Sequence, residues 1–474
     1  MKKARVMTDV SDLEIAPTIR NPRVTDWAAW IAEARALAKL AGPLAFTQLM
    51  QMAIMTTDLI MLGRLGKEAI AAAALGNTVF FFTWLVAMGP AAAVSPMIAH
   101  LLGAHPSDRA NVRAVTRMGF WATWLLCIPL AGLLLSTEWI LLAFGQSPKL
   151  AHLASQFTLP LCLGLFFNMG FQVLRSHTTA LGKPTASLIV MVSTVFFNAL
   201  AAYTLIFGHF GFPRLEVVGS GIATATSFGF SLILMCVVIH FMPALRPYHL
   251  LRQFGRADWP KLAEVFRLGM PIGLTMIFEA MLFNCSMLVM GIFGTDFVAA
   301  HQIALNVPSI TFMVPLGIAM AGTVRVGLSA GAGDIEGARR AGYTAMLMST
   351  LFMGLCGIAI ALFAKQIAEL YFGSSAVDAK VVSLTVTFLY VAAAFQVFDA
   401  LQVVAALALR GLKDARVPMW LAGASYWLVG APTSLILAFR FHMGGLGIWI
   451  GLAVALGAAS VLLSARFWYL TRKD

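Results

Sequence analysis

Two carboxylates lie deep inside long apolar stretches of this sequence. Glu279 is the only charged residue between Leu268 and Phe293, and Asp399 lies in an otherwise uncharged run that ends at Leu409. With a helical rise of about 1.5 Å per residue, each carboxylate would lie about 15 Å from the nearer end of its run. An ionised carboxylate costs at least about 2.5 kcal/mol at the centre of a bilayer, and neither run contains a Lys or Arg partner. The two acids are therefore predicted to bind a proton or a metal cation such as Na⁺.

Aromatic and amide side chains flank the two acids. Aromatic faces attract organic cations by about 0.5–2 kcal/mol each, and amides can bond a polar ligand. The sequence therefore favours a substrate cavity at this depth, although two protonated acids that bond neighbouring helices would explain the same pattern. The flanking residues that we assign to the cavity are Phe278, Phe283, Gln396 and Gln402.

A third acid, Asp58, lies nearer to the end of its apolar run. It precedes Gly63, where the run ends, by five residues, which corresponds to about 8 Å along a helix. Asp58 is a candidate for cation coupling, but it could also reach the membrane surface or cap polar backbone.

The elements that must hold these acids are long apolar helices. The chain of 474 residues has 60% hydrophobic and 11% charged residues, with a mean hydropathy of +0.84. Continuous apolar runs indicate an all-α polytopic membrane protein, because the strands of a β-barrel would show short alternating segments. Twelve runs are long enough to cross a bilayer; they span roughly 40–63, 74–102, 118–144, 150–174, 184–208, 217–243, 268–293, 297–324, 342–364, 381–409, 417–439 and 444–465.

Basic residues are concentrated in alternate loops. If the N-terminus is cytoplasmic, most of the 33 Lys and Arg residues lie in cytoplasmic segments, among them Arg175 just after the fourth run. We therefore expect both termini in the cytoplasm, with residues 1–36 as a tail. The same pattern explains the net charge of +12 without a nucleic-acid partner, since no loop combines a basic patch with interleaved aromatic residues.

Cysteine and histidine give no pattern of a metalloenzyme. The 5 cysteines lie in predicted spans without CxxC spacing, and no two of the 9 histidines stand at positions i and i+4. No nucleophile and base pair, and no phosphate-binding GxxxxGK[ST] sequence, is visible either. The sequence therefore does not favour an enzyme.

The two halves of the chain resemble each other at an offset of 228 residues. "LAGPLAFTQ" (Leu40–Gln48) aligns with "LGMPIGLTM" (Leu268–Met276), and Gly89 aligns with Gly317. The pattern predicts two six-helix repeats related by a pseudo-two-fold axis along the membrane normal, a geometry that suits alternating access. The expected organisation is an N-terminal bundle (37–243), a cytoplasmic linker (244–261) and a C-terminal bundle (262–470).

The acids depart from this repeat. Glu279 lies opposite Gln51, which we include in the predicted substrate cavity, and Asp399 lies opposite Met169. A shared scaffold therefore does not dictate the acids, and this favours a function for them.

The ordered set of these features resembles the multidrug and toxic compound extrusion (MATE) family. The resemblance is carried by "GPLAFTQLMQMAIMTTDLIMLGRLG" (Gly42–Gly66), "GMPIGLTMIFEAMLFNCS" (Gly269–Ser286) and "LRGLKDARVPM" (Leu409–Met419), with "IFGHFGFPRLEVVGSGIATATS" (Ile206–Ser227) similar to the NorM-type branch. It implies an inner-membrane antiporter that expels amphipathic, often cationic compounds in exchange for Na⁺ or H⁺, without another cofactor, and works as a monomer among membrane lipids.

The resemblance also assigns site residues. Glu279, Asp399 and Asp58 match the family's cation-coupling acids. Asn198 matches a polar residue of the N-terminal bundle, and we include it in the predicted substrate cavity. Ala202, one turn after Asn198, replaces a polar residue common in the family, and Phe395 stands where some sodium-coupled members have Tyr. The coupling ion therefore stays open, with the two acids of the C-terminal bundle favoured. The alternative function is a flippase for a lipid-linked saccharide, which would favour basic residues in the cavity.

Overall fold

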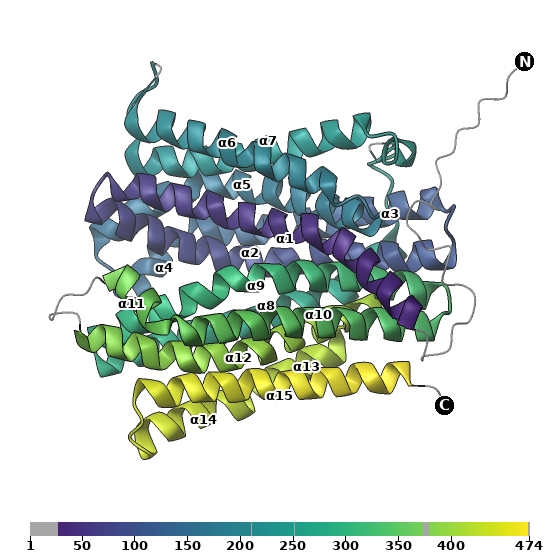
Figure 1. Cartoon of the computed structure of the whole chain (residues 1–474). Coiled ribbons are helices and arrows are strands. Elements are labelled where there is room, and N and C mark those ends of the chain that lie inside the picture. Colours follow the sequence, from purple (N-terminus) through teal and green to yellow (C-terminus); the bar gives the residue numbers. More distant parts are fainter. Residues whose placement is uncertain (1–26, 210, 251, 373–378, 473–474) are drawn as a thin grey trace, which may run out of the picture. The chain divides into compact units, whose positions relative to one another are not determined.

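The computed structural model describes residues 27–209, 211–250, 252–372 and 379–472. Within these ranges every regular element is a helix, and twelve helical segments are long and apolar enough to cross a membrane (Figure 1). The prediction of an all-α membrane protein with twelve spans is confirmed. The spans are α1 (Trp27–Gly63), α2 (Lys67–Ala104), α3 (Arg109–Leu135), α5 (Pro148–Ala180), α6 (Thr185–Phe207), α7 (Glu216–Phe241), α8 (Trp259–Phe293), α9 (Thr295–Gly331), α10 (Ile335–Leu362), α12 (Ala379–Gly411), the segment Arg416–Arg440 and α15 (Gly445–Thr471).

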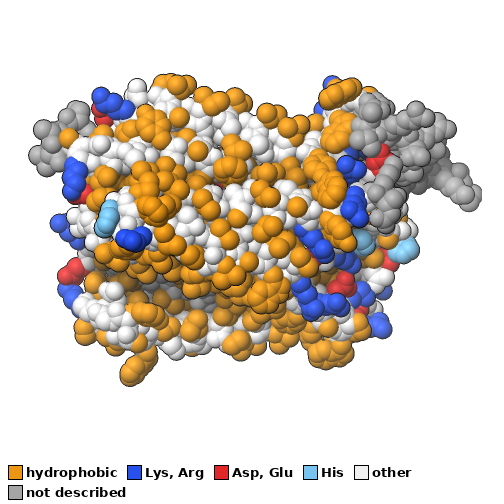
Figure 2. Space-filling view, turned by 90° about the horizontal axis from the view of Figure 1, so that it is seen from below, with side chains coloured by type: hydrophobic (Ala, Val, Ile, Leu, Met, Phe, Trp, Pro, Cys, Tyr) orange, Lys and Arg blue, Asp and Glu red, His pale blue; other side chains and the backbone are white. Residues whose placement is uncertain are grey.

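The apolar surface of these helices is consistent with a lipid environment. Large apolar side chains point outward, for example Leu288 at 75% exposure and Phe196 at 72%. Figure 2 shows hydrophobic side chains over the middle of the visible face, while Lys and Arg side chains gather toward the helix ends. Because water would disfavour so much exposed apolar area, this arrangement fits helices surrounded by lipid.

Several observed helices differ from the predicted runs. The run predicted at 118–144 divides into α3 and a short helix, α4 (Thr137–Ala143), at Ser136, whose ψ of 9° departs from the α-helical value and whose backbone N–H is shared between the carbonyls of Gly132 and Leu133. The second half has an equivalent short helix, α11 (Ala364–Phe372), after α10. α5 continues past the predicted end at residue 174 to Ala180. The fourth span is therefore longer than its apolar run, and its last residues are polar.

The described chain forms two compact units. The N-terminal unit is 47–273, and the C-terminal unit combines 27–46 with 274–472. The division falls inside α1 and α8, the first helix of each half. Within the N-terminal unit, α5 packs against α2, α3 and α7; within the C-terminal unit, α12 packs against α9, α10 and α15. Each central helix therefore has neighbours at equivalent places in its own half of the chain.

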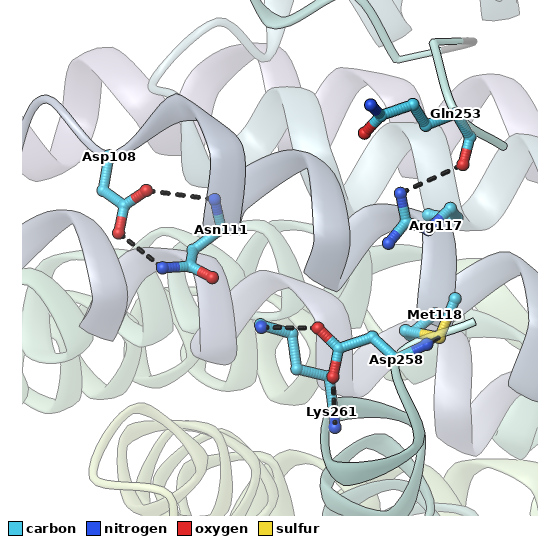
Figure 3. A network of polar contacts seen from close by, with 7 residues as sticks. All are labelled: Asp108, Asn111, Arg117, Met118, Gln253, Asp258 and Lys261. Atoms are coloured by element: carbon cyan, nitrogen blue, oxygen red, sulfur yellow. Dashed lines mark hydrogen bonds and ion pairs between the residues drawn. The ribbon is translucent and has the colours of Figure 1, made fainter. Parts of the chain in front are cut away.

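Helix ends repeat the duplication seen in the sequence. Gly66 and Gly294, which precede α2 and α9, have φ angles of 113° and 114°, a region that disfavours residues with a Cβ. Asp108 caps α3 by accepting a hydrogen bond of 3.0 Å from the backbone N–H of Asn111 (Figure 3), and Asp334 caps α10 in the same way. The same local chemistry therefore begins equivalent helices in both halves.

Small residues allow close helix crossings at equivalent positions. In the N-terminal unit, a Cβ added to Gly89 of α2 would collide with the backbone at Gly269 and Gly273 of α8. In the C-terminal unit, a Cβ on Gly317 of α9 would collide with the backbone of Ala45 in α1. Small residues that let membrane helices approach closely explain why the sequence alignment matches Gly89 to Gly317.

The eleventh span is irregular. It consists of α13 (Arg416–Ala424), a π-helical turn at Ser425–Gly430, α14 (Ala431–Leu435) and a second π-helical turn at Ile436–Arg440. π-helical turns widen a helix locally and often occur at functional sites. The first of the two turns contains Tyr426, which is fully buried.

Candidate functional site

The structure brings Glu279 and Asp399 to one side chain, the amide of Gln402. The Nε2 atom of Gln402 donates a hydrogen bond of 2.9 Å to Oε1 of Glu279 and reaches Oδ1 of Asp399 at 3.5 Å. Glu279 comes from α8, whereas Asp399 and Gln402 are one helical turn apart on α12. The amide therefore links two carboxylates whose helices are distant in sequence, all within the C-terminal unit.

Tyr426 completes this arrangement and was not predicted from the sequence. Its hydroxyl donates a hydrogen bond of 2.5 Å to Oε1 of Gln402. Because the Gln402 oxygen is held by Tyr426, its NH₂ group must point toward the two acids. The signal in the sequence is a single Tyr in an apolar span that also contains Gly423, Gly430 and Pro432, but only the π-helical turn shows where its ring points.

The surroundings of the two acids differ. Asp399 is buried at 7% exposure, whereas Glu279 is half-buried. Arg410, at the end of α12, is close enough to attract Glu279 electrostatically. The sequence showed no basic partner inside either apolar run, and the structure adds this one from beyond the end of the run. When both acids are ionised, the single charge of Arg410 balances only one of their two charges.

The other residues predicted around the acids have mixed environments. Gln396 is fully buried and accepts a hydrogen bond of 3.3 Å from Thr311 of α9, while no described residue bonds its Nε2 atom. Phe278 lies against Gly423 at the end of α13, and both Phe278 and Phe283 pack against the apolar core of the C-terminal unit. The two aromatic rings thus support packing around the acids.

Asp58 has its own environment in the N-terminal unit. Thr224 of α7 donates a hydrogen bond of 3.1 Å to Oδ2 of Asp58. Asn198, fully buried on α6, lies beside the same carboxyl group without a well-formed hydrogen bond to it. The structure therefore brings together Asp58 and Asn198, the two residues that the sequence assigned to this half.

Gln51 lies beside a buried cation. Nη1 of Arg175 donates hydrogen bonds of 3.2 Å to Gln51 and 3.3 Å to Gln172, and Nη2 donates to Gln48. Arg175 was expected in a loop, which is wrong: α5 extends to Ala180 and leaves Arg175 only 3% exposed. Three glutamine carbonyls replace the water that its guanidinium would lose.

The two units therefore hold buried charges of opposite sign near equivalent positions. The sequence repeat matches Gln51 to Glu279 at an offset of 228 residues and, later in the chain, Gln172 to Gln402 at an offset of 230. In the N-terminal unit, Gln51 and Gln172 accept hydrogen bonds from the guanidinium of Arg175. In the C-terminal unit, Glu279 is itself an acid, and Gln402 joins it to Asp399. The duplicated helices therefore surround a cation in the N-terminal unit and a pair of acids that can bind a cation in the C-terminal unit.

The chemistry of the carboxylate pair suits a small hard cation or a proton. Carboxylate oxygens are preferred ligands of hard cations, and two neighbouring carboxylates favour binding of a proton because it removes the repulsion between their charges. In the part of the chain that the structure describes, no group of three His, Cys, Asp or Glu side chains could hold a metal. Glu279 and Asp399 would thus need other oxygen atoms to complete a metal site.

Comparison with known proteins identifies the family. The family model described as MatE matches residues 43–204 and again residues 271–436. The chain belongs to the MATE family. The double match supports the duplication, because both halves of this MATE protein resemble the same model. MATE proteins are transporters, so the chain is not an enzyme.

Bacterial relatives share most of the length of this MATE protein. A protein of Brucella suis biovar 1 (strain 1330), named "Probable multidrug resistance protein NorM", is 40% identical over 94% of this chain and 95% of its own. A protein of Mesorhizobium japonicum with the same name is 42% identical, and the matched region covers 92% of this chain and 94% of the relative.

Solved structures show the same fold. The eukaryotic MATE transporter AtDTX14 is 24% identical over 92% of this chain and 96% of its own, with a TM-score of 0.81. A structure titled "Crystal structure of MATE in complex with MaL6" covers 93% of this chain and 98% of its own, with 20% identity and a TM-score of 0.83. The family model and the bacterial relatives confirm the resemblance noted in the sequence, and the solved structures confirm the fold.

Proposed function

We propose that this MATE protein is a secondary multidrug efflux antiporter of the bacterial inner membrane. It exports small amphipathic organic cations by alternating access, in exchange for Na⁺ or H⁺, and works as a monomer with both termini in the cytoplasm. The names of its bacterial relatives support multidrug efflux. The observation that carries the proposal is the amide of Gln402 joining Glu279 and Asp399 inside membrane-spanning helices.

The carboxylate pair supplies the exchange. When both acids are free, their charge favours an organic cation; when a proton or Na⁺ binds, that charge is neutralised and the organic cation is released. Each ion lowers the affinity for the other by the same factor, as linkage requires. Glu279, half-buried, is the group that ligands meet first, while Asp399, buried beside Gln402, holds the coupling ion.

Asp58 contributes a second, weaker cation site in this proposal. Thr224 already donates a hydrogen bond to its carboxyl group, and the amide of Asn198 beside it can donate another to an ionised acid. Gln51 and Phe278 would line the route of the organic cation in their own units. A flippase of lipid-linked saccharides is not favoured, because the linked acids would repel a pyrophosphate group.

Transport into proteoliposomes tests the proposal. The purified protein is reconstituted, and uptake of a fluorescent organic cation is followed under an imposed Na⁺ gradient and, separately, under a pH gradient. Wild type is compared with Glu279→Gln, Asp399→Asn and the exposed control Glu216→Gln. We expect one gradient to drive uptake, and both site variants, but not the control, to lose it.

Each contrary result has a clear meaning. Uptake that persists in both site variants would show that the paired acids are structural, and would move coupling to Asp58. Uptake of the organic cation without any response to either gradient would contradict antiport.

A further inference from the structure

The N-terminal unit contains a cavity that the transport proposal does not use. It has a volume of about 560 Å³ and lies where α3 and α7 meet the segment that joins the two halves of the chain. Most of its lining is apolar, and its mouth carries basic side chains. The apolar residues of its lining include Phe120, Trp124, Leu174, Leu232 and Ile239.

The basic side chains are gathered on one side of the cavity. Arg246 and Arg252 come from the connecting segment and are exposed, as is His249. Among the described residues that line the cavity, none is acidic. The cavity therefore combines an apolar interior with a positively charged opening.

Arg117 adds a buried guanidinium to this lining. It is only 5% exposed, and its Nη1 atom donates a hydrogen bond of 3.1 Å to the backbone carbonyl of Gln253 (Figure 3). Its Nε atom has no hydrogen-bond partner among the described residues. Asp258 attracts Arg117 from a distance, but its carboxylate is held by Lys261 at 2.7 Å. A buried donor without an acceptor is costly, so the site favours an anionic ligand.

The wall of the cavity is fixed in place by α3. The indole of Trp121 donates a hydrogen bond of 3.2 Å to the carbonyl of Phe254. The ring of Phe254 lies edge-on to Phe120, with 5.6 Å between the centroids, and 6.1 Å from Trp124. These contacts hold the connecting segment against the helix, so the cavity is formed before any ligand enters.

We propose that this cavity binds one anionic phospholipid of the surrounding membrane. An acyl chain would fill the apolar interior, and the phosphate would lie at the mouth among Arg117, Arg246 and Arg252. Basic pockets between membrane helices at the membrane surface suit anionic headgroups, whereas a free phosphate leaves the apolar lining without a partner. This site is separate from the carboxylate pair and goes beyond the proposed transport function.

Retention of lipid by the purified protein tests the proposal. The protein is incubated in detergent with phosphatidylglycerol or phosphatidylcholine, and bound lipid is counted by native mass spectrometry. The variant Arg246→Gln with Arg252→Gln removes two charges at the mouth. Its matched control, Arg35→Gln with Arg267→Gln, removes two exposed charges that do not line the cavity. We expect the first pair to weaken retention of phosphatidylglycerol about tenfold and the control pair to change it less than about twofold.

A second measurement locates the lipid even if a variant folds poorly. A phosphatidylglycerol with a photoreactive group on its acyl chain is crosslinked to the wild-type protein, and the modified peptides are identified. We expect labels on α3 and α7, for example at Phe120, Leu232 or Ile239. Excess unlabelled phosphatidylglycerol should remove them, while inorganic phosphate should not.

The outcomes that overturn the proposal are distinct. Equal retention of phosphatidylglycerol and phosphatidylcholine would exclude recognition of the anionic headgroup. Equal losses in the two variant pairs would show only general attraction to a basic surface. Displacement by inorganic phosphate would assign the basic residues to a soluble anion, and labels elsewhere would remove the lipid from this cavity.

Discussion

Gln402 donates its side-chain amide to Glu279 across 2.9 Å, although the two residues lie on α12 and α8 and are 123 positions apart in the sequence. The same nitrogen is 3.5 Å from Asp399. One neutral amide thus links two acids that lie within membrane-spanning helices. A change of this amide should alter the ion dependence of transport without removing either acid.

Replacement of Gln402 by leucine tests that relationship. Leucine keeps an apolar side chain of related size but provides no donor, and a hydrogen bond to a charged group contributes about 1.5–3 kcal/mol. We expect the concentration of coupling ion at half-maximal transport to change by about tenfold or more. Gln366→Leu, on the exposed surface of α11, is the control and should leave this concentration unchanged. An unchanged ion dependence in Gln402→Leu would show that the amide does not organise the acids.

Tyr426→Phe should produce a smaller change of the same kind. The ring still fills its buried position, but the hydroxyl no longer holds the Gln402 oxygen at 2.5 Å, so the amide can rotate. Transport is measured in this variant, in Gln402→Leu and in the double variant. Because both residues act through one amide, the double variant should match Gln402→Leu alone. Additive losses of transport in the double variant would instead show that Tyr426 has a separate role. Tyr390→Phe, at an exposed position of α12, is the control for the loss of a hydroxyl.

The sequence predicted the membrane fold well because the bilayer constrains it strongly. Twelve apolar runs are sufficient to count the spans, and a carboxylate such as Glu279 stands out because its burial is costly. Arg175 was misplaced because glutamines of α1, far from it in the sequence, replace the water around its guanidinium, and the apolar run that precedes Arg175 gives no signal of them. Tyr426 was missed because its direction depends on a π-helical turn, for which an apolar run gives no signal.

The buried ion pair of Glu33 and Arg325 should be important for stability. Arg325 donates hydrogen bonds of 2.8 Å and 2.5 Å to the two carboxylate oxygens of Glu33, and both side chains are less than a tenth exposed. Glu33→Gln leaves a buried charge without its carboxylate, which costs about 3–5 kcal/mol. The exposed pair of Lys149 and Glu68 is a control within the same chain, and Glu68→Gln should cost less than about 1 kcal/mol.

Thermal unfolding in detergent measures both changes. Glu33→Gln should unfold at a clearly lower temperature than wild type, whereas Glu68→Gln should unfold near the wild-type temperature. Similar unfolding temperatures for the two variants would mean that burial adds nothing to the Glu33 pair.

The cap of α3 should lose stability in acid. The hydrogen bonds from the side chain and backbone N–H of Asn111 lower the pKa of Asp108 below its ordinary value of 3.8. An acid whose pKa is lower in the folded than in the unfolded protein stabilises the folded state when the pH is above its ordinary pKa. This stabilisation is lost as the pH falls from the ordinary pKa through the lower pKa of the folded state. Protection against hydrogen exchange at the start of α3, measured relative to the intrinsic exchange rate at each pH, should therefore fall below pH 3.8. Asp108→Asn can still cap the helix but does not titrate, so this change with pH should be absent from that variant. The same change in Asp108→Asn would show that another group causes it.

The close crossings at Gly89 and Gly317 should be equally sensitive to added volume. A methyl group at Gly89 meets the backbone at Gly269, and one at Gly317 meets the backbone of Ala45, so neither neighbour can rotate away as a flexible side chain would. Gly89→Ala and Gly317→Ala should each destabilise the protein by about 1–3 kcal/mol. Gly42→Ala is the control, because no atom lies within 4 Å of its added Cβ, and alanine is the better helix former there. Thermal unfolding of the three variants measures these effects. A lower unfolding temperature for Gly89→Ala and Gly317→Ala, but not for Gly42→Ala, would show that the duplicated glycine allows close helix approach in both halves. Equal unfolding temperatures for all three variants would show that these helices can move apart at little cost.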